Sequence, residues 1–250
     1  MGTLAASMAI FADGLNTIIG SIRRMSDYER KVIIEKYNYD EALRYLGYGN
    51  STPDEKTKEL LLSCGEELKK VVDGKFIYKV FDLVNGQPER INFKLHGKSV
   101  ALHLKNCNKV IFLCATLSAG VDLLIRKKQI TSMTEAMIMD SLASAVIEQI
   151  CDRAEEIMLA DFKEYQHTWR YGLGYGDFPI TDQKSFLEIL DAPKRIGVCV
   201  NNSMMLTPSK SVTCVIGLGH DLAVSSRKSC DACNLRETCR FRKEGKSCSL

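Results

Sequence analysis

The feature that most constrains the fold is an uninterrupted helical pattern that begins near Ser132. The run Ser132-Met133-Thr134-Glu135 has the spacing of a capping box, in which hydroxyl and carboxylate groups satisfy backbone N–H groups at a helix start. The pattern continues without glycine or proline through MIMDSLASAVIEQICDRAEEIMLADF. The sequence therefore predicts one long helix, of more than about 25 residues.

Shorter helices are expected on both sides of this segment. Apolar residues recur every three or four positions in YERKVIIEKY, DEALRYL and TKELLLSCGEELKKVV, so residues 27–72 predict two or three helices. The same kind of pattern predicts helices near 98–105, 118–128 and 181–190.

Four further segments have the composition of strands. KFIYKVFDLV and ERINFKL flank the turn residues Asn85 to Pro88 and predict a β-hairpin. NKVIFLCATL predicts a buried strand, and RIGVCV and SVTCVIG predict two more. Because helices precede and separate these strands without regular βαβ alternation, we expect an α+β fold with a mainly antiparallel sheet, flanked by helices and followed by a small cysteine-rich appendage.

Length and charge limit the domain organisation and the kinds of partner. The 250 residues allow a helical N-terminal extension at 1–26, one large domain at 27–226 and a basic tail at 227–250. Thirty-four basic against 31 acidic residues give a net charge of only +3, which argues against a nucleic-acid partner. No apolar run approaches the roughly 20 residues needed to cross a bilayer, so no membrane association is expected.

Six of the cysteines are scattered through apolar contexts such as FLCAT and GVCVN. Buried thiols of this kind are typical of a protein in a reducing cytoplasm. The other four cysteines lie close together near the C-terminus. They are Cys230, Cys233, Cys239 and Cys248. Four thiolates at this spacing predict a metal site, either a zinc knuckle or an iron–sulfur cluster, and the spacing does not separate the two; the alternative is that the four are free or disulfide-prone thiols.

A second concentration of special residues is the segment RYGLGYGDFP, which begins at Arg170. Gly172, Gly174 and Gly176 alternate with other residues, and glycine lets a ligand approach the backbone closely. Arg170 offers a forked donor for a carboxylate, and either of the two tyrosines, Tyr171 or Tyr175, offers an aromatic wall that can face a sulfonium. Taken alone, such a loop is more often only a turn.

Glu148 lies on the predicted long helix, on a face expected to carry also Ser141, Ser144, Ala145, Cys151 and Asp152. Small residues on that face would let a ligand approach the helix backbone. Taken alone, a helix glutamate is more often simply solvated.

Several local strings resemble the activation domain of cobalamin-dependent methionine synthase, here as a stand-alone chain. The resemblance covers roughly residues 40–220 and is carried by CNKVIFLCATLSAGVD, LASAVIEQ, the Arg-x-x-x-Gly-Tyr pattern that begins at Arg170, and MLTPSKSVTCVIG. It implies that Arg170 holds the carboxylate of S-adenosylmethionine (AdoMet), that Gly172, Gly174 and Tyr175 form the loop against its adenosine, and that Glu148 lies near its positive groups.

The resemblance also implies a role: AdoMet-dependent reductive methylation of a cobalamin bound by a separate methionine synthase or corrinoid methyltransferase, with electrons from a further donor. No catalytic acid or base is nominated, and whether the chain is an enzyme in its own right is left open.

Two alternatives remain, an iron–sulfur electron-transfer module and a zinc-stapled docking module, each with the same fold but without AdoMet.

Overall fold

The computed structural model describes residues 28–49, 51–222 and 237, and their core is one antiparallel sheet. The strand order is β1 (Tyr28–Val32), β2 (Gly74–Val84), β4 (Lys109–Thr116), β9 (Ser211–Gly219) and β5 (Gln166–His167). β3 (Gln87–Pro88) pairs with β2, and β6 (Tyr171–Gly172) pairs with β9. A separate small ribbon joins β7 (Cys199–Val200) to β8 (Leu206–Thr207).

Both faces of the central strands are buried, which explains why β4 reads as a continuous apolar run. Ile111, Leu113 and Ala115 enter one hydrophobic core, and their neighbours Val110 and Phe112 enter the other. Because successive side chains of a strand point to opposite faces, a sheet covered on both sides needs apolar residues at every position.

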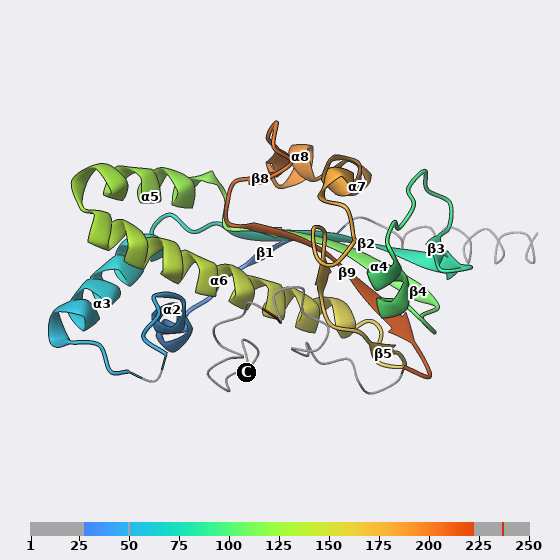
Figure 1. The fold of residues 1–250 in the computed structure, drawn as a ribbon, viewed down its shortest axis with the longest axis horizontal. Coiled ribbons are helices and arrows are strands. Elements are labelled where there is room, and N and C mark those ends of the chain that lie inside the picture. The colour runs from blue at the N-terminus through green and yellow to red at the C-terminus, as the bar shows by residue number, and fades with distance from the viewer. Residues whose placement is uncertain (1–27, 50, 223–236, 238–250) are drawn as a thin grey trace, which may run out of the picture.

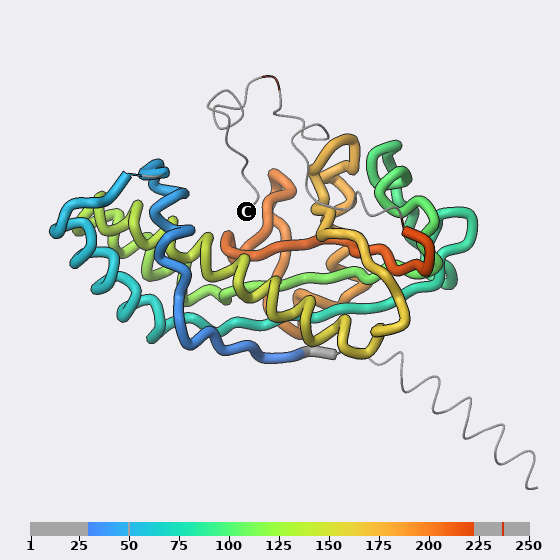
Figure 2. Tube along the Cα trace, turned by 90° about the horizontal axis from the view of Figure 1, so that it is seen from below, coloured from blue at the N-terminus to red at the C-terminus, as the bar shows by residue number. Residues whose placement is uncertain are grey.

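The helices divide between the two faces, as Figure 1 shows, with α6 below the sheet and α7 and α8 above it. The first core contains residues from α2 (Tyr39–Tyr45), α3 (Glu55–Lys69), α5 (Ala119–Thr131) and α6 (Met133–Leu159). The second core contains residues from α4 (Lys98–His103), α7 (Gln183–Leu190) and α8 (Ala192–Arg195), and the 3-10 helix η1 (Ile180–Asp182) leads directly into α7. Figure 2 shows α2, α3 and α5 gathered at one end of α6.

The long helix α6 spans 27 residues and confirms the strongest sequence prediction. The Ser132 hydroxyl accepts a hydrogen bond from the backbone N–H of Glu135, as the capping spacing predicted. The Glu135 carboxylate does not complete the capping box, because it instead binds Lys128 of α5. The helix start is thereby joined to the helix before it.

Two local predictions were wrong. Residues 28–32 form strand β1, not a helix, because this segment pairs in register with β2 and buries Val32 while Ile33 stays 81% exposed. The predicted second strand of the hairpin, residues 89–95, is not a strand; β2 instead pairs with Gln87–Pro88, which the sequence placed in the turn. Pro88 has no N–H for a ladder hydrogen bond, and Arg90 has a φ of 64°, which takes the chain out of the extended conformation.

The predicted α+β class with a mainly antiparallel sheet is confirmed, since every strand pairing in the described residues is antiparallel. None of the helices formed by these residues is long and apolar enough to span a bilayer. Of the six scattered cysteines, four are buried, whereas Cys107 is half-buried and Cys199 is exposed. The predicted N-terminal extension and all but one residue of the tail lie outside the described residues.

Leu142 gives a test of how much stability the packing of α6 against the sheet provides. Its side chain is fully buried, so Leu142→Ala is expected to lower the free energy of unfolding by about 2–5 kcal/mol. Met137 lies on the same helix but is 59% exposed, so Met137→Ala should cost less than about 0.5 kcal/mol. Urea denaturation followed by circular dichroism measures both, and equal effects would contradict this packing.

Candidate functional site

Arg170 lies between two short strands that both pair with β9. Residues 166–167 form β5 and residues 171–172 form β6, so the glycine-rich segment that begins at Arg170 starts as a strand of the sheet. Tyr171 lies opposite Val215 and Gly172 lies opposite Cys214. The pairing with a central strand fixes the backbone on both sides of Arg170.

The guanidinium of Arg170 contacts three carboxylates of α6. Nη2 lies 3.1 Å from Oε2 of Glu148 and 2.8 Å from Oδ1 of Asp152, and Nη1 lies 3.1 Å from Oε1 of Glu155. The three acids occupy positions i, i+4 and i+7, which fall on one face of a helix. The Arg170 side chain is only 12% exposed, so the cluster is a partly desolvated ionic contact between α6 and the sheet.

The three carboxylates differ in their exposure to solvent. The side chains of Asp152 and Glu148 are 64% and 41% exposed, whereas that of Glu155 is 23% exposed. Burial raises the pKa of Glu155 above its ordinary value, and the charge of Arg170 acts in the opposite direction. Glu155 is therefore the most enclosed of the three, and the other two face solvent.

The turn after β6 is closed by its own hydrogen bonds. The N–H of Tyr175 donates to the carbonyl of Gly172, and the N–H of Gly174 donates to the carbonyl of Phe178. Gly174 has a φ of 88°, a conformation that favours glycine. A Cβ on Gly172 would lie 3.0 Å from the ring of Tyr175, so this glycine makes room for that ring. Tyr175 is nevertheless 64% exposed, and its ring centroid lies 6.3 Å from that of Tyr171.

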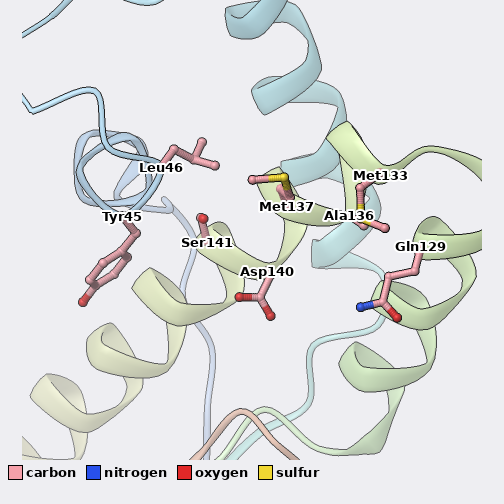
Figure 3. Close-up of a pocket in the computed structure, with 8 residues that line it drawn as sticks. All are labelled: Tyr45, Leu46, Gln129, Met133, Ala136, Met137, Asp140 and Ser141. Carbon is pink, nitrogen blue, oxygen red and sulfur yellow. The ribbon is translucent and has the colours of Figure 1, made fainter.

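A groove of about 280 Å³ lies near the start of α6 (Figure 3). The end of α2 provides Tyr45 and Leu46, α5 provides one residue, and α6 provides the others. The remaining lining residues are Gln129, Met133, Ala136, Met137, Asp140 and Ser141. The pKa of Tyr45 is raised to about 12 by partial burial, by a hydrogen bond with Glu41 and by the charges of Glu41 and Glu148.

A second cation contacts the same side of α6. Nζ of Lys210, just before β9, lies 2.8 Å from Oδ1 of Asp140 and 2.9 Å from Oγ of Ser144. Asp140 lies about two turns before Glu148, and Ser144 lies about one turn before it. Lys210 therefore contacts the part of α6 that ends at Ser144, and Arg170 contacts the part that begins at Glu148.

The structure brings Glu148 and Arg170 together and places Gly172, Gly174 and Tyr175 in the adjacent turn. Sequence reasoning did not single out Glu155 or Tyr45. The spacing of Glu155 from Glu148 was a usable signal, whereas nothing local to α2 pointed to Tyr45.

The predicted metal ligands Cys230, Cys233, Cys239 and Cys248 lie outside the described residues. Within the part of the chain that is described, no group of three or more His, Cys, Asp or Glu side chains is arranged to hold a metal ion.

The arrangement suits a small zwitterionic ligand with additional positive charge. A guanidinium can bind a carboxylate through two parallel hydrogen bonds. Carboxylates that surround it on a solvent-facing helix can pair with ammonium or sulfonium groups of the same ligand.

His103 supports the strand segment that holds Arg170. Its ring packs against Trp169 and Tyr171, with centroids 4.7 and 4.8 Å away, and its Nε2–H donates to the carbonyl of Trp169. Burial lowers the pKa of His103 to about 4, and the hydrogen bond to Trp169 acts in the opposite direction. His103 is therefore neutral at pH 7.

This burial of His103 predicts a loss of stability in acid. Between pH 6.5 and about 4 the unfolded chain binds a proton at His103 that the folded chain does not, so stability falls as the pH falls. From pH 7 to pH 5 the loss from this residue should be about 2 kcal/mol. His103→Gln removes the titrating group but retains an N–H donor. The difference between wild type and variant, measured by urea denaturation at both pH values, should show this loss, and identical pH dependence would contradict the assignment.

Comparisons with known proteins show that this fold is shared with a solved structure. The sequence matches no protein-family model and no curated protein. Among solved structures, the fold is similar to the crystal structure of the MetH reactivation domain bound to AdoHcy. The TM-score is 0.56, the identity is 13%, and the match covers 89% of this chain and 87% of that chain. At this level of identity the match shows a shared fold, so the chain has the fold of that reactivation domain.

Proposed function

We propose that this protein binds AdoMet at the face of α6 around Arg170 and serves the reductive methylation of cobalamin. The observation that carries the proposal is the guanidinium of Arg170, 12% exposed and held against Glu148, Asp152 and Glu155. The shared fold supports it, because the similar MetH domain was solved with AdoHcy, the demethylated form of AdoMet.

Each group of AdoMet has a complementary group at this face. The methionine carboxylate is assigned to the guanidinium of Arg170, and the ammonium and sulfonium are assigned to the side of Glu148. The adenosine is assigned to the turn formed by Gly172, Gly174 and Tyr175. The N–H groups of Gly174 and Tyr175 are already used within that turn, so the nucleoside would meet the exposed Tyr175 ring and backbone carbonyl groups.

Binding requires an exchange of partners at Arg170. The ligand carboxylate replaces at least one resident carboxylate, and Asp152 and Glu148 are the more exposed of the three. A displaced exposed side chain is solvated by water, whereas the more enclosed Glu155 retains its contact with Arg170. The exchange costs part of the gross binding energy, so we expect moderate affinity.

The proposed reaction needs alignment of a methyl group with a cobalt ion. AdoMet supplies the methyl group, and a reduced cobalamin on the partner accepts it. The task of this chain is to orient the ligand at an accessible face and to dock onto a corrinoid-dependent methionine synthase or methyltransferase in the cytoplasm. A separate donor provides the electron.

Arg170 provides the first test of the proposal. Arg170→Ala and Arg170→Lys are expected to weaken AdoMet binding at least about tenfold, because both remove the forked donor pair. Isothermal titration calorimetry measures the dissociation constants. Arg153 is a matched control, since it lies on α6 and pairs with Glu156 instead of the cluster. Wild-type affinity in both Arg170 variants would refute the assigned carboxylate site.

The methyl-transfer role is tested separately from binding. Under anaerobic conditions, this protein, methyl-labelled AdoMet and a chemical reductant are mixed with a cobalamin-dependent methionine synthase that lacks its own activation domain. Labelled methylcobalamin, detected by absorbance and label, is expected only with all components and not with Arg170→Ala. If AdoMet binds but no methylcobalamin forms, the reductive methylation role is refuted for that partner class.

A further inference from the structure

The charge of this chain is unevenly distributed along the sequence. Residues 227–250 contain seven lysine and arginine residues and three aspartate and glutamate residues, which gives this tail a net charge of +4. Residues 1–226 have a net charge of −1. The positive excess of the whole protein is therefore a property of the tail, and a segment of this charge is attracted to acidic surfaces.

An acidic surface lies along the second half of α6 and the turn that follows it. Residues 148–170 contain six acidic and three basic residues, a net charge of −3. Arg170 is shared by three of these acids, of which Asp152 has a side chain that is 64% exposed. Asp161 and Glu164, beyond the end of the helix, are also exposed. The carboxylates outnumber the cations among them, so this surface can bind a further segment that is rich in cations.

The described chain reaches Leu222 beside this acidic surface. The N–H of Leu222 donates to Oε1 of Gln166 at 2.8 Å. Gln166 and His167 form β5, which Figure 1 shows just beyond the end of α6, and His167 interacts electrostatically with Glu155. The residues that follow Leu222 therefore start next to the acidic surface.

The connection between Leu222 and the basic tail is short. Four uncharged residues, 223–226, precede the first basic residues, Arg227 and Lys228. The five residues from Leu222 to Arg227 span at most about 17 Å when fully extended. A segment tethered at this range has an effective concentration on the order of millimolar at the surface. A separate basic partner would need a comparable concentration to compete, which favours the tail of the same chain as the occupant.

We infer that the basic tail docks in cis on the acidic surface of residues 148–170, with its lysine and arginine side chains against Asp152 and the neighbouring exposed carboxylates. Several solvent-exposed ion pairs, each weak alone, hold it there, so the contact is reversible and depends on ionic strength. The docking goes beyond the proposed function and does not depend on it.

The docked tail covers the face of α6 that is assigned to AdoMet. The cations of the tail and the ammonium and sulfonium of AdoMet require the same carboxylates, so each excludes the other. The tail is then an internal competitor that keeps the site covered until the ligand is present. This consequence, unlike the docking, rests on the proposed function.

Zero-length cross-linking of the full chain tests the docking. A water-soluble carbodiimide joins lysine amines to carboxylates in direct contact, and the cross-linked monomer is separated from dimers before peptide mass spectrometry. At low salt, tail lysines should link to the carboxylates of residues 148–170 at least about fivefold more often than to Glu59, an exposed carboxylate of α3. Salt at about 0.5 M should remove this preference. The tail lysines are Lys228, Lys243 and Lys246.

Charge reversal tests whether electrostatic attraction is the cause. Arg240→Glu combined with Arg242→Glu lowers the net charge of the tail to zero and retains its lysines and cysteines. The yield of cross-links to the acidic surface should fall at least about threefold. Arg23→Glu combined with Arg24→Glu is the matched control, because it makes the same change of charge far away in the sequence. Its yield should equal that of the wild type, and circular dichroism checks that each variant is folded.

The ligand tests the competition. AdoMet at saturation, established by calorimetry, should lower the yield of cross-links between the tail and Asp152 at least about threefold, because the carboxylates are then occupied by the ligand.

The outcomes separate the docking from the proposed function. If tail lysines link to the acidic surface no more often than to Glu59, if the links occur only in dimers, or if charge reversal leaves their yield unchanged, the docking is refuted. If AdoMet binds and the yield does not change, the competition alone is refuted. If AdoMet does not bind, the proposed function is refuted and the competition with it, whereas the cross-links still decide the docking.

Discussion

The burial of both faces of β4 and β9 is the constraint on which the rest of the structure depends. A sheet that is apolar on both sides needs a helical layer on each face, and α6 is the longest element of one layer. The buried side of α6 supplies Leu142, Val146 and Ile150 to the core. Its remaining side carries the polar residues of the site, so one helix both stabilises the sheet and presents the acidic cluster.

Elements with a strong local signal could be predicted from the sequence. The Ser132 cap and the long run without glycine or proline determine α6, and the apolar run of β4 identifies a buried strand. Prediction failed where tertiary pairing determines the structure. Residues 28–32 have a helical pattern of apolar residues but form a strand because they pair with the edge of β2. No local signal in the sequence indicates that β2 is their partner.

The candidate site was partly predictable for the same reason. Arg170 and Glu148 were singled out from local strings and a family resemblance, and the structure places them in contact. The additional partners of Arg170 follow from helix periodicity once one acid is known to face it. The electrostatic interaction of Tyr45 with Glu148 depends on how α2 packs against α6. This is a long-range contact that the local sequence pattern does not encode.

The contacts of Lys210 and Arg170 with α6 have a mechanical consequence. The helix is tethered to the region of β9 through Asp140 and Ser144 at one point, and through the Arg170 cluster at another. Loss of one carboxylate contact within the cluster would leave the helix held by Lys210 and by the contact between Arg170 and Glu155. Two separate ionic attachments therefore restrict rotation of α6 about its axis relative to the sheet.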